Sequence, residues 1–485
     1  MGMLAASAPP TLPMSAVLAA MRRDPDGEWH AADLMRAAGL ASGSLYVALH
    51  GLQRRGWVTR TQTDAGTPAP GRYRYAITPL AVHTDSAHDA GTRSRRAVHA
   101  AGWVVAAIVA LVQAAEALSC TGAQRMPDLG VYVGAVSGLR HGASLYDFVD
   151  GNDAPFTYPP FAGMLFWPLT YVARGPLDVA WTAATIAIVL GLAVYVARDT
   201  RLPAPLTAIV LLLSAPVSSN LRFGQVSVAL AALVVLDIAV LRATRWHGVL
   251  TGVAAAIKLT PLIFIPLLWR AGRRRAALVA TATFAVCAAI GYAAAPNDSR
   301  RFWGTAMWHV ERLGHVTVSG NQSVDGALMR LGFADPGRSL VAMLIAGTVA
   351  VLALRRAGWA ARAGDWFSAI VIVGAACVVA SPVSWTHHQI WLVMAAGLPV
   401  AAGASARRAW PLLVLAVMLL PVTTIGAKLG WPPLEDARLL LAVAIACLVP
   451  IAAHSWRPPP AARRGNRTAR QGPGQSGTAR AGTVT

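Results

Sequence analysis

Charged side chains are scarce in this sequence: 13% of its 485 residues are Asp, Glu, Lys or Arg, whereas soluble domains carry about 25%. Lysine is nearly absent, because Lys258 and Lys428 are the only two. Hydrophobic residues make up 55% of the chain, and the mean hydropathy is +0.50. These values argue against a soluble protein and predict a polytopic membrane protein with a soluble appendage.

Cysteine is also rare, and its positions are uninformative. The four cysteines, Cys120, Cys287, Cys377 and Cys447, are scattered along the chain without paired spacing. We therefore predict neither a disulfide framework nor a metal site, and we interpret the cysteines as small apolar residues. A cleavable signal peptide is not expected either, since the first long apolar run begins near residue 99.

Acidic residues are few relative to basic ones. The chain has 22 Asp and Glu against 42 Lys and Arg, so its formal net charge is +20, nearly all of it from arginine. Much of the arginine lies in short clusters between apolar runs and in the C-terminal tail. Such clusters are typical of cytoplasmic loops that face anionic lipid, and not of a nucleic-acid-binding surface.

Residues 1–90 do not have the composition of a membrane protein. Apolar residues recur at helical spacing in three segments and alternate in two more, which flank a turn that contains Pro and Gly. Three helices followed by a hairpin is the order of a winged helix. The expected helices are 14–21, 30–38 and 42–55, the expected strands are 57–62 and 72–77, and the expected turn is 64–71.

The segment from Ser42-Gly43-Ser44-Leu45-Tyr46 to Val58, followed by Gly71 to Thr78, resembles the PadR-type transcriptional regulators. The resemblance covers residues 13–80 and implies that the third helix enters the DNA major groove while the hairpin touches the backbone. That helix is weakly basic until Arg54 and Arg55, so we expect modest DNA affinity. A module that contacts a protein, or a fusion that has lost its DNA site, is the open alternative.

Long apolar segments follow one another from residue 99. Each has roughly 16–21 residues, about the length that the hydrocarbon core requires. Two more stretches are ambiguous, because 159–173 is short and 246–269 is broken at Lys258-Leu259-Thr260-Pro261, so we expect ten to twelve crossings. The expected spans are 99–119, 177–197, 203–219, 225–241, 276–295, 339–354, 366–383, 389–405, 410–426 and 437–454.

The arginine clusters also set the expected orientation. Residues 91–98 form a polar linker with several arginines, which places the N-terminal domain in the cytoplasm. The membrane domain is then 99–454, and the Arg/Pro/Gly-rich tail 455–485 is expected to be disordered and cytoplasmic. The segments expected on the outer face are 120–158, 296–338, 384–388 and 427–436.

Several polar residues interrupt the apolar segments, where a polar group is unfavourable unless it has a partner or faces a cavity. Asp128 follows the first apolar segment, at the rim of the hydrocarbon. Asp128 is open to a second interpretation, as a helix-capping residue in a solvated loop. The other polar residues are open to interpretation as helix–helix hydrogen-bonding groups. Because Asp128, 321–323 and 385–388 fall on one face, we favour a shared external cavity.

A series of motifs then occurs in a specific order. It resembles the actinobacterial integral-membrane mannosyltransferases of glycosyltransferase family eighty-seven, in the GT-C superfamily, over residues 99–454. The N-terminal domain is a departure, since usual members begin near the first span. The motifs are Asp128 with Tyr132, Gly142-x-x-Leu145-Tyr146, Tyr158-Pro159-Pro160, Gly224-Gln225, Lys258-Leu259-Thr260-Pro261, Asn321-Gln322-Ser323 and Ser384-Trp385-x-His387-His388.

The resemblance implies a GT-C type all-α membrane fold and a reaction on the outer face. The donor would be polyprenyl-phosphate-mannose, and the acceptor a lipid-linked mannan or lipoglycan that is extended by an α-1,2 linkage. The donor carries its own phosphate leaving group, so no nucleotide-binding fold and no cofactor are expected. Asp128 matches the family's first-loop aspartate and is the expected general base, which predicts a single inverting displacement.

His387 and His388 are further catalytic candidates, and the other polar and aromatic residues are candidates for substrate binding. Lys258, Arg330 and one of the two histidines would stabilise the phosphate charge, although Lys258 is also open to interpretation as a span-end lysine and Arg330 as an ordinary loop arginine. Adjacent histidines diverge by about 100° on a helix, so we predict no metal site and expect one ring to face the cavity while the other packs. The aromatic residues would stack on sugar or prenyl groups, with a place at the membrane interface as the alternative. The aromatic candidates are Tyr132, Tyr146, Tyr158 and Trp385, and the polar candidates are Asn220, Gln225, Asn321, Gln322 and Ser323.

Two other classes of function remain open. A membrane-anchored winged-helix transcription regulator explains residues 1–90 but leaves Asp128 without a role. A lipid-linked sugar flippase or transporter predicts polar residues through the membrane depth on both sides, and Lys258 and Asn220 fit that pattern faintly. The enzyme and the regulator are compatible within one fused chain, whose partners would be the donor, a glycan acceptor, the bilayer and DNA or a protein.

Overall fold

The computed structural model describes most of the chain. The turn predicted at 64–71 and the tail predicted at 455–485 lie outside the part that it describes. The described residues are 11–62, 73–200, 202–309, 316–335 and 337–452.

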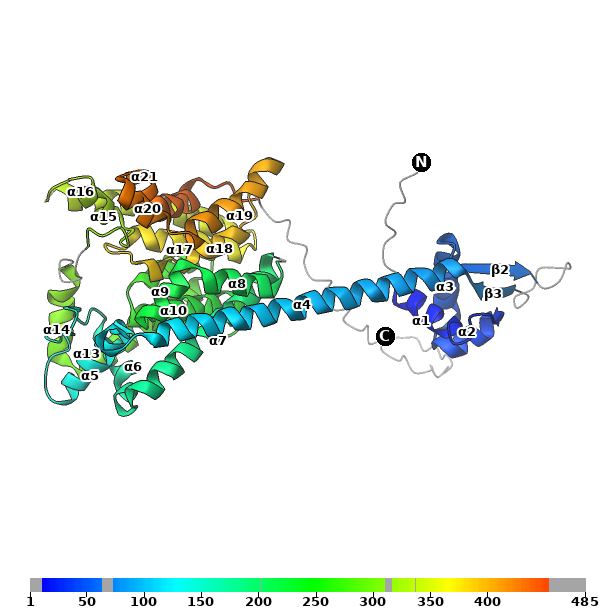
Figure 1. Ribbon diagram of the computed structural model, residues 1–485, viewed down its shortest axis with the longest axis horizontal. Coiled ribbons are helices and arrows are strands. Elements are labelled where there is room, and N and C mark those ends of the chain that lie inside the picture. Colours follow the sequence, from blue (N-terminus) through cyan, green and yellow to red (C-terminus); the bar gives the residue numbers. More distant parts are fainter. Residues whose placement is uncertain (1–10, 63–72, 201, 310–315, 336, 453–485) are drawn as a thin grey trace, which may run out of the picture. The chain divides into compact units, whose positions relative to one another are not determined.

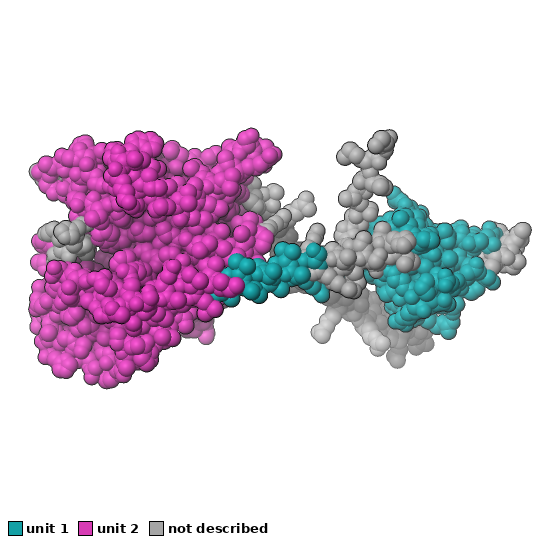
Figure 2. All heavy atoms as spheres, in the orientation of Figure 1, with its two compact units in different colours: residues 1–107 teal, residues 108–485 magenta. Residues whose placement is uncertain are grey.

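The chain divides into two compact units, Met1–Ala107 and Ile108–Thr485, which Figure 2 distinguishes by colour. The division falls within one long helix, α4 (Pro79–Ser119), which begins in the first unit and ends in the second. The stretch 91–98, predicted as a linker, is therefore helical. Its neighbourhood contains Gly91 but no proline after Pro79, so nothing in the local sequence ends the helix.

The first unit packs three helices against a small antiparallel sheet, in the helix–helix–helix–hairpin order that the sequence predicts (Figure 1). Strand β3 is central and pairs with β2 along its whole length, and the two-residue β1 adds a third strand that the sequence did not indicate. The elements are α1 (Leu12–Met21), β1 (Trp29–His30), α2 (Ala31–Ala38), α3 (Ser42–Arg54), β2 (Val58–Gln62) and β3 (Tyr73–Ile77).

The core of the first unit follows from helical periodicity. In α3 the buried residues are Leu45, Ala48, Leu49 and Leu52, which recur at the three- and four-residue spacing of one helix face. They pack with the buried face of α1 and with the inward residues of the sheet. The opposite face of α3 is exposed.

Among the described residues, four helices are long and apolar enough to cross a membrane: 96–119 of α4, α7 (Arg174–Thr200), α13 (Arg274–Ala294) and α16 (Gly337–Arg362). By length and composition the described residues hold six such spans if two bent helix pairs are each counted as one. The pairs are α8 (Ala204–Leu213) with α9 (Ala215–Phe223), bent by 60°, and α19 (Ala404–Leu419) with α20 (Val422–Leu429), bent by 70°.

The second unit thus has fewer long helices than the sequence has apolar segments, because several segments consist of shorter pieces. The segment 246–269 breaks at Lys258, as predicted. The segment 389–405 is no single helix, since it contains two short helical pieces before an extended stretch. The pieces are α10 (Ser227–Val235), the π-helical turn η3 (Leu236–Val240), α11 (Val249–Ile257), η5 (Thr260–Ile263), α12 (Phe264–Arg270), η8 (Thr386–Gln389), α18 (Ile390–Met394), η9 (Ala395–Gly397), α22 (Ala437–Val443) and η10 (Ala444–Leu448).

Helix α17 (Trp366–Ala380) lies at the centre of the second unit. Every residue from Trp366 to Val379 is buried, as expected for a helix that is apolar on all sides. It packs against α16, α18 and α22, and Figure 1 shows α17 and α18 side by side. The remaining short elements are η1 (Gly122–Gln124), α5 (Pro127–Arg140), α6 (Pro160–Phe166), η2 (Trp167–Tyr171), η4 (Leu241–Ala243), α14 (Pro296–Gly304), η6 (Ala306–Trp308), α15 (Val324–Arg330) and α21 (Pro432–Glu435).

Candidate active site

The second unit contains a partly open cavity of about 660 Å³. Its walls come from the start of α5, the loop 152–159, the turn between α9 and α10, the break after α11, and the segments 306–309, 318–320 and 381–388. These pieces are far apart in sequence, and most of them are the irregular breaks between helices. A break exposes backbone and polar side chains, and such groups are tolerated at membrane depth where they line a cavity.

Asp128 lies in the first turn of α5, on the cavity wall. Met126 precedes the helix in a left-handed conformation with φ 44°, and Pro127 occupies a first-turn position where its missing N–H is not needed. Arg174 of α7 donates from Nη2 to the carbonyls of Arg125 at 3.0 Å and of Met126 at 2.9 Å. The unusual turn before Asp128 is thus held from outside the helix.

Arg174 is itself fixed by a carboxylate. Its Nε lies 2.6 Å from Oδ1 of Asp178, one helical turn further along α7, and the Asp178 side chain is buried. A buried carboxylate needs such a partner. The ion pair therefore anchors the start of α5 to a long helix and restricts where the Asp128 side chain can point.

Gln225 reaches Asp128 from the turn between α9 and α10. Gly224 has φ 71°, and a Cβ there would lie 2.8 Å from Cβ of Leu129 and 2.9 Å from Cβ of Met126. Glycine therefore meets both a backbone and a packing requirement at this contact. With the turn this close to α5, Nε2 of Gln225 donates to Oδ2 of Asp128 at 2.5 Å.

Two tyrosines complete this network. The hydroxyls of Tyr132 and Tyr158 lie 3.0 and 2.9 Å from Oε1 of Gln225 and 2.8 Å from each other. Both side chains are buried, and the Tyr132 ring stacks on Phe166 with 4.7 Å between centroids. Burial raises the pKa of both phenols, so they stay protonated as hydrogen-bond donors.

The environment also shifts the protonation of Asp128. Burial raises the pKa of its carboxyl to about 6, and the Gln225 hydrogen bond and the charge of Lys258 oppose this rise. Asp150 raises it slightly by like charge. A carboxylate with a pKa near the working pH is ionised yet basic enough to accept a proton, which is what a general base requires.

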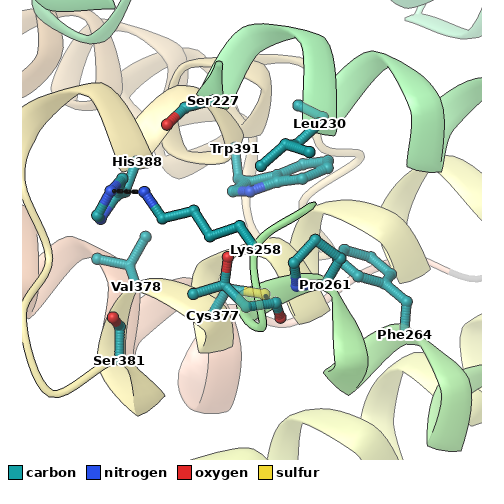
Figure 3. Close-up of a pocket in the computed structure, with 12 residues that line it drawn as sticks. Ser227, Leu230, Lys258, Pro261, Phe264, Cys377, Val378, Ser381, His388 and Trp391 are labelled. Carbon is teal, nitrogen blue, oxygen red and sulfur yellow. Dashed lines mark hydrogen bonds between the residues drawn. The ribbon is translucent and has the colours of Figure 1, made fainter. Parts of the chain in front are cut away.

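Lys258 and His388 also line the cavity. Lys258 ends α11 in an extended conformation just before η5, and its Nζ lies 2.7 Å from Nε2 of His388. Figure 3 shows the lysine side chain extended toward that ring, with the hydrogen bond dashed. Apolar side chains line the pocket around the lysine methylene groups, including Leu230, Cys377, Val378 and Trp391.

The two histidines both line the cavity, whereas we expected one to pack away from it. Their rings are 4.6 Å apart and nearly perpendicular on the short turn η8. Burial, and the neighbouring Lys258 charge, lower the pKa of both imidazoles well below the usual range, so both are neutral. Nε2 of His387 and Nδ1 of His388 are buried without a hydrogen-bond partner among the described residues.

Two further aromatic candidates lie on the cavity wall. Tyr146 donates from its hydroxyl to the carbonyl of Tyr158 at 2.8 Å and stacks on Phe302 with 5.7 Å between centroids. Trp385 precedes η8 and also borders the cavity. These rings give the cavity the apolar faces against which sugars and prenyl groups pack.

Five predicted binding residues have other contacts and do not line the cavity. Asn220 bonds the Gln225 carbonyl at 2.8 Å and the Val228 amide at 3.1 Å, which stabilises the turn that carries Gln225. Ser323 caps α15, accepting from the Gly326 amide at 3.0 Å. The other three are Asn321, which accepts from the Ser384 amide at 2.9 Å, Gln322, which donates to the Glu435 carbonyl at 2.9 Å, and Arg330, which pairs with Asp436 and Glu435.

The cavity also has polar residues that the sequence motifs did not indicate. Asn152, Asp153 and His309 border it on the side of the loop that precedes α6 and of the segment after α14. Asp153 has φ 58°, a conformation that aspartate tolerates better than most residues. These residues lie in polar loops, where an isolated Asn, Asp or His gives no sequence signal.

Comparison with known proteins gives a consistent set of similarities. A family model described as glycosyltransferase family 87 matches residues 156–382. A polyprenol-phosphate-mannose-dependent α-(1-2)-phosphatidylinositol mannoside mannosyltransferase of Mycobacterium tuberculosis is 36% identical over 282 residues, which are 53% of this chain and 64% of that protein. No solved structure matches the chain significantly.

Two relatives from Mycolicibacterium smegmatis are similar to the same extent. A polyprenol-phosphate-mannose-dependent α-(1-2)-phosphatidylinositol pentamannoside mannosyltransferase is 34% identical over 282 residues, 55% of this chain and 67% of that protein. A phosphatidylinositol mannoside mannosyltransferase is 34% identical over 274 residues, 50% of this chain and 61% of that protein. The chain thus spans about two thirds of the length of the curated relatives it matches, and slightly less for two of these three.

Proposed function

Because the chain belongs to glycosyltransferase family 87, we propose that it transfers a hexose from a polyprenyl-phosphate donor to a hydroxyl of a lipid-linked or cell-envelope glycan. The names of its relatives favour mannose as the sugar and an α-1,2 linkage. One observation carries the proposal: a carboxylate, Asp128, and the hydrogen-bonded pair of Lys258 and His388 line a single cavity. These are the two chemical groups that a one-step glycosyl transfer requires.

In the proposed reaction the acceptor hydroxyl approaches Asp128 and gives its proton to the carboxylate. The acceptor oxygen forms a bond to C1 of the hexose while the bond from C1 to the phosphate oxygen breaks. The electron pair of that bond leaves with the polyprenyl phosphate, whose growing negative charge Lys258 stabilises. One displacement inverts the configuration at C1, so a β-linked donor gives an α-linked product.

His387 and His388 are the proposed supporting groups on the donor side. His388 accepts from the Lys258 ammonium, which orients that cation toward the cavity. The unpartnered nitrogens of both rings supply further hydrogen bonds to the donor phosphate or to sugar hydroxyls. Tyr146, Tyr158 and Trp385 are the proposed stacking surfaces for the sugar.

We infer that the cavity opens on the outer face of the cell membrane, with the N-terminal domain and the C-terminal tail in the cytoplasm. The arginines in the last turns of α7, α12 and α16, which are Arg198, Arg270 and Arg362, support this orientation. The domains proposed are 1–90, a helical linker 91–98, the transferase domain 99–454 and the tail 455–485.

We also propose that the first unit is a winged-helix module. Its exposed α3 face supports contact with a protein more than with DNA, because Tyr46 and Val47 are 45% and 74% exposed there and the described cations of α3 lie at its end. Retention of the full-length protein at physiological salt on a specific duplex sequence, in preference to random duplex DNA, would favour the DNA alternative.

The test of the proposed function is transfer in isolated membranes. Membranes that express the protein, and membranes with an empty vector, are supplied with labelled polyprenyl-phosphate-mannose. We expect labelled glycolipid only with the protein, and release of the label by an α-1,2-specific mannosidase. Labelled product that resists this enzyme would contradict the linkage, and label that appears on the other leaflet without glycan product would favour a flippase.

A further inference from the structure

We propose that Gln225 is a positioning residue for the general base: its side-chain amide fixes the carboxylate of Asp128, and the hydroxyls of Tyr132 and Tyr158 fix the amide. The inference rests on the proposed function, since it assigns the control of the base in that reaction. Among the described residues, Gln225 is the one side chain that hydrogen-bonds Asp128.

The number of available hydrogens determines the direction of each bond. The hydroxyls of Tyr132 and Tyr158 and Oε1 of Gln225 make three close contacts, and the two phenols have one hydrogen each. At most one of these hydrogens lies between the two hydroxyls, so at least one phenol donates to Oε1 of Gln225. With its oxygen occupied in this way, the amide presents its NH2 group to Asp128. An ionised carboxylate has no proton to donate, so this is the orientation that suits the base form.

Lys258 extends the same chain toward the donor side of the cavity. Its Nζ lies 3.5 Å from the Tyr158 hydroxyl and 5.1 Å from the centroid of that ring. An ammonium has only donors, so Tyr158 accepts from Lys258 and its own hydrogen is left for Gln225 or Tyr132. A continuous hydrogen-bonded relay, Lys258–Tyr158–Gln225–Asp128, thus connects the two sides of the reaction.

The relay has a specific consequence for catalysis. Gln225 engages Oδ2 of Asp128, which leaves Oδ1 to accept the hydroxyl of the acceptor. The same bond favours the ionised form of the carboxylate, against the burial that favours the protonated form. Lys258 acts in the same direction and Asp150 in the opposite one. Loss of the amide donor would therefore move the protonation of Asp128 to higher pH.

A merely structural role for Gln225 makes a different prediction. Its backbone carbonyl already ties the α9–α10 turn to Asn220, and that bond does not involve the side chain. If the side chain only packed the helices together, an isosteric change would leave the protonation of Asp128 unaltered. Two variants separate the roles: Gln225→Glu keeps the shape but replaces the amide donor with a second acid, and Gln225→Met removes both polar atoms.

The experiment uses the full-length protein in membranes and two independent readouts. The first is the pH dependence of mannose transfer. The second is modification of Asp128 by dicyclohexylcarbodiimide, which reacts with protonated carboxyls in apolar surroundings and is quantified by mass spectrometry of the peptide. The second readout needs folded protein but no turnover, so it separates failure of the inference from failure of the proposed function.

Two midpoints are measured: the pH of half-maximal transfer on the acid side, and the pH of half-maximal labelling of Asp128. We expect both midpoints to rise by about one pH unit in Gln225→Met, because a hydrogen bond to a charged group is lost. In Gln225→Glu we expect a larger rise, since two adjacent carboxyls share a proton. Gln322→Met is the matched control: it removes a buried amide that bonds Ser319 and Glu435, and both midpoints should stay at the wild-type values.

Wild-type midpoints in both Gln225 variants would overturn the inference, even if their activity were lower. A wild-type protein that labels at Asp128 with the expected midpoint but transfers no mannose would overturn the proposed function, and with it the catalytic purpose of Gln225. Transfer by the wild type with raised midpoints in both variants supports the two together.

Discussion

Nζ of Lys258 lies 2.7 Å from Nε2 of His388, although 130 residues separate them in the sequence. The ammonium can only donate in this contact, so His388 accepts through Nε2 and carries its hydrogen on Nδ1. Burial and the charge of Lys258 keep the imidazole neutral. The pair therefore presents one positive charge, in a fixed position, to the cavity that Asp128 faces.

Replacement of Lys258 tests the role of this charge. Lys258→Met keeps the length of the side chain but removes the cation, and we expect transfer to fall by about a hundredfold or more. The control is Lys428→Met, which removes the chain's other lysine from an exposed position in α20 and should leave transfer unaltered. Equal activity of the two variants would exclude Lys258 from stabilisation of the leaving phosphate.

The pKa of Asp128 sets the acid side of the pH profile. A base must be ionised to accept a proton, and burial raises this pKa to about 6. Transfer should therefore be maximal above pH 7 and fall as the pH drops through about 6. The fall should follow the titration of a single proton. A profile that stays flat down to pH 4.5 would contradict assignment of Asp128 as the base, because the carboxyl would then be protonated in active enzyme.

Arg174 should affect catalysis without touching the cavity. Arg174→Met releases the carbonyls of Arg125 and Met126 and leaves buried Asp178 without its close partner, so we expect at least a tenfold loss of transfer and a lower melting temperature. Arg140→Met is the control, because Arg140 lies at the other end of α5, where its hydrogen bond to Thr170 is exposed. A melting temperature that falls without loss of transfer would limit Arg174 to a structural role.

Arg330 separates structural residues from binding residues. Its side chain is only 9% exposed and pairs with Asp436, which is equally buried, so Arg330→Met should destabilise the protein by about 3–5 kcal/mol. The KM for the donor should not change. Arg301→Met removes an exposed pair with Asp147 and should change stability by no more than about 1 kcal/mol. A raised donor KM in the Arg330 variant at normal stability would restore its predicted role in binding.

The sequence predicted some parts of this site and not others, for identifiable reasons. Asp128, Gln225 and Lys258 could be predicted from the sequence, because each is a polar residue beside a break in an apolar segment, where it needs a partner or a cavity. The hydrogen bonds that join them could not be predicted, because Gln225 lies 97 residues from Asp128. The same holds for Arg330, whose partner Asp436 lies 106 residues away, so its burial in an ion pair gave no local signal.

The fold was predictable to a similar degree. The length and position of the apolar segments predicted most helical segments and the break at Lys258. It did not reveal that the segments 203–219 and 410–426 bend by 60° and 70°, because the bends depend on how the pieces pack as well as on Pro216 and Pro421. The number of crossings stays a prediction of ten to twelve. Helix α4 shows the opposite case, since a polar composition suggested a linker where the backbone continues as a helix.

The role of Asp128 as the base is tested most directly by mannose transfer from labelled polyprenyl-phosphate-mannose by wild type and Asp128→Asn in matched membranes. The substitution keeps the shape of the side chain and removes the base, so we expect transfer by the wild type and a loss of about a hundredfold or more in the variant. Equal transfer by both proteins would contradict the mechanism proposed here.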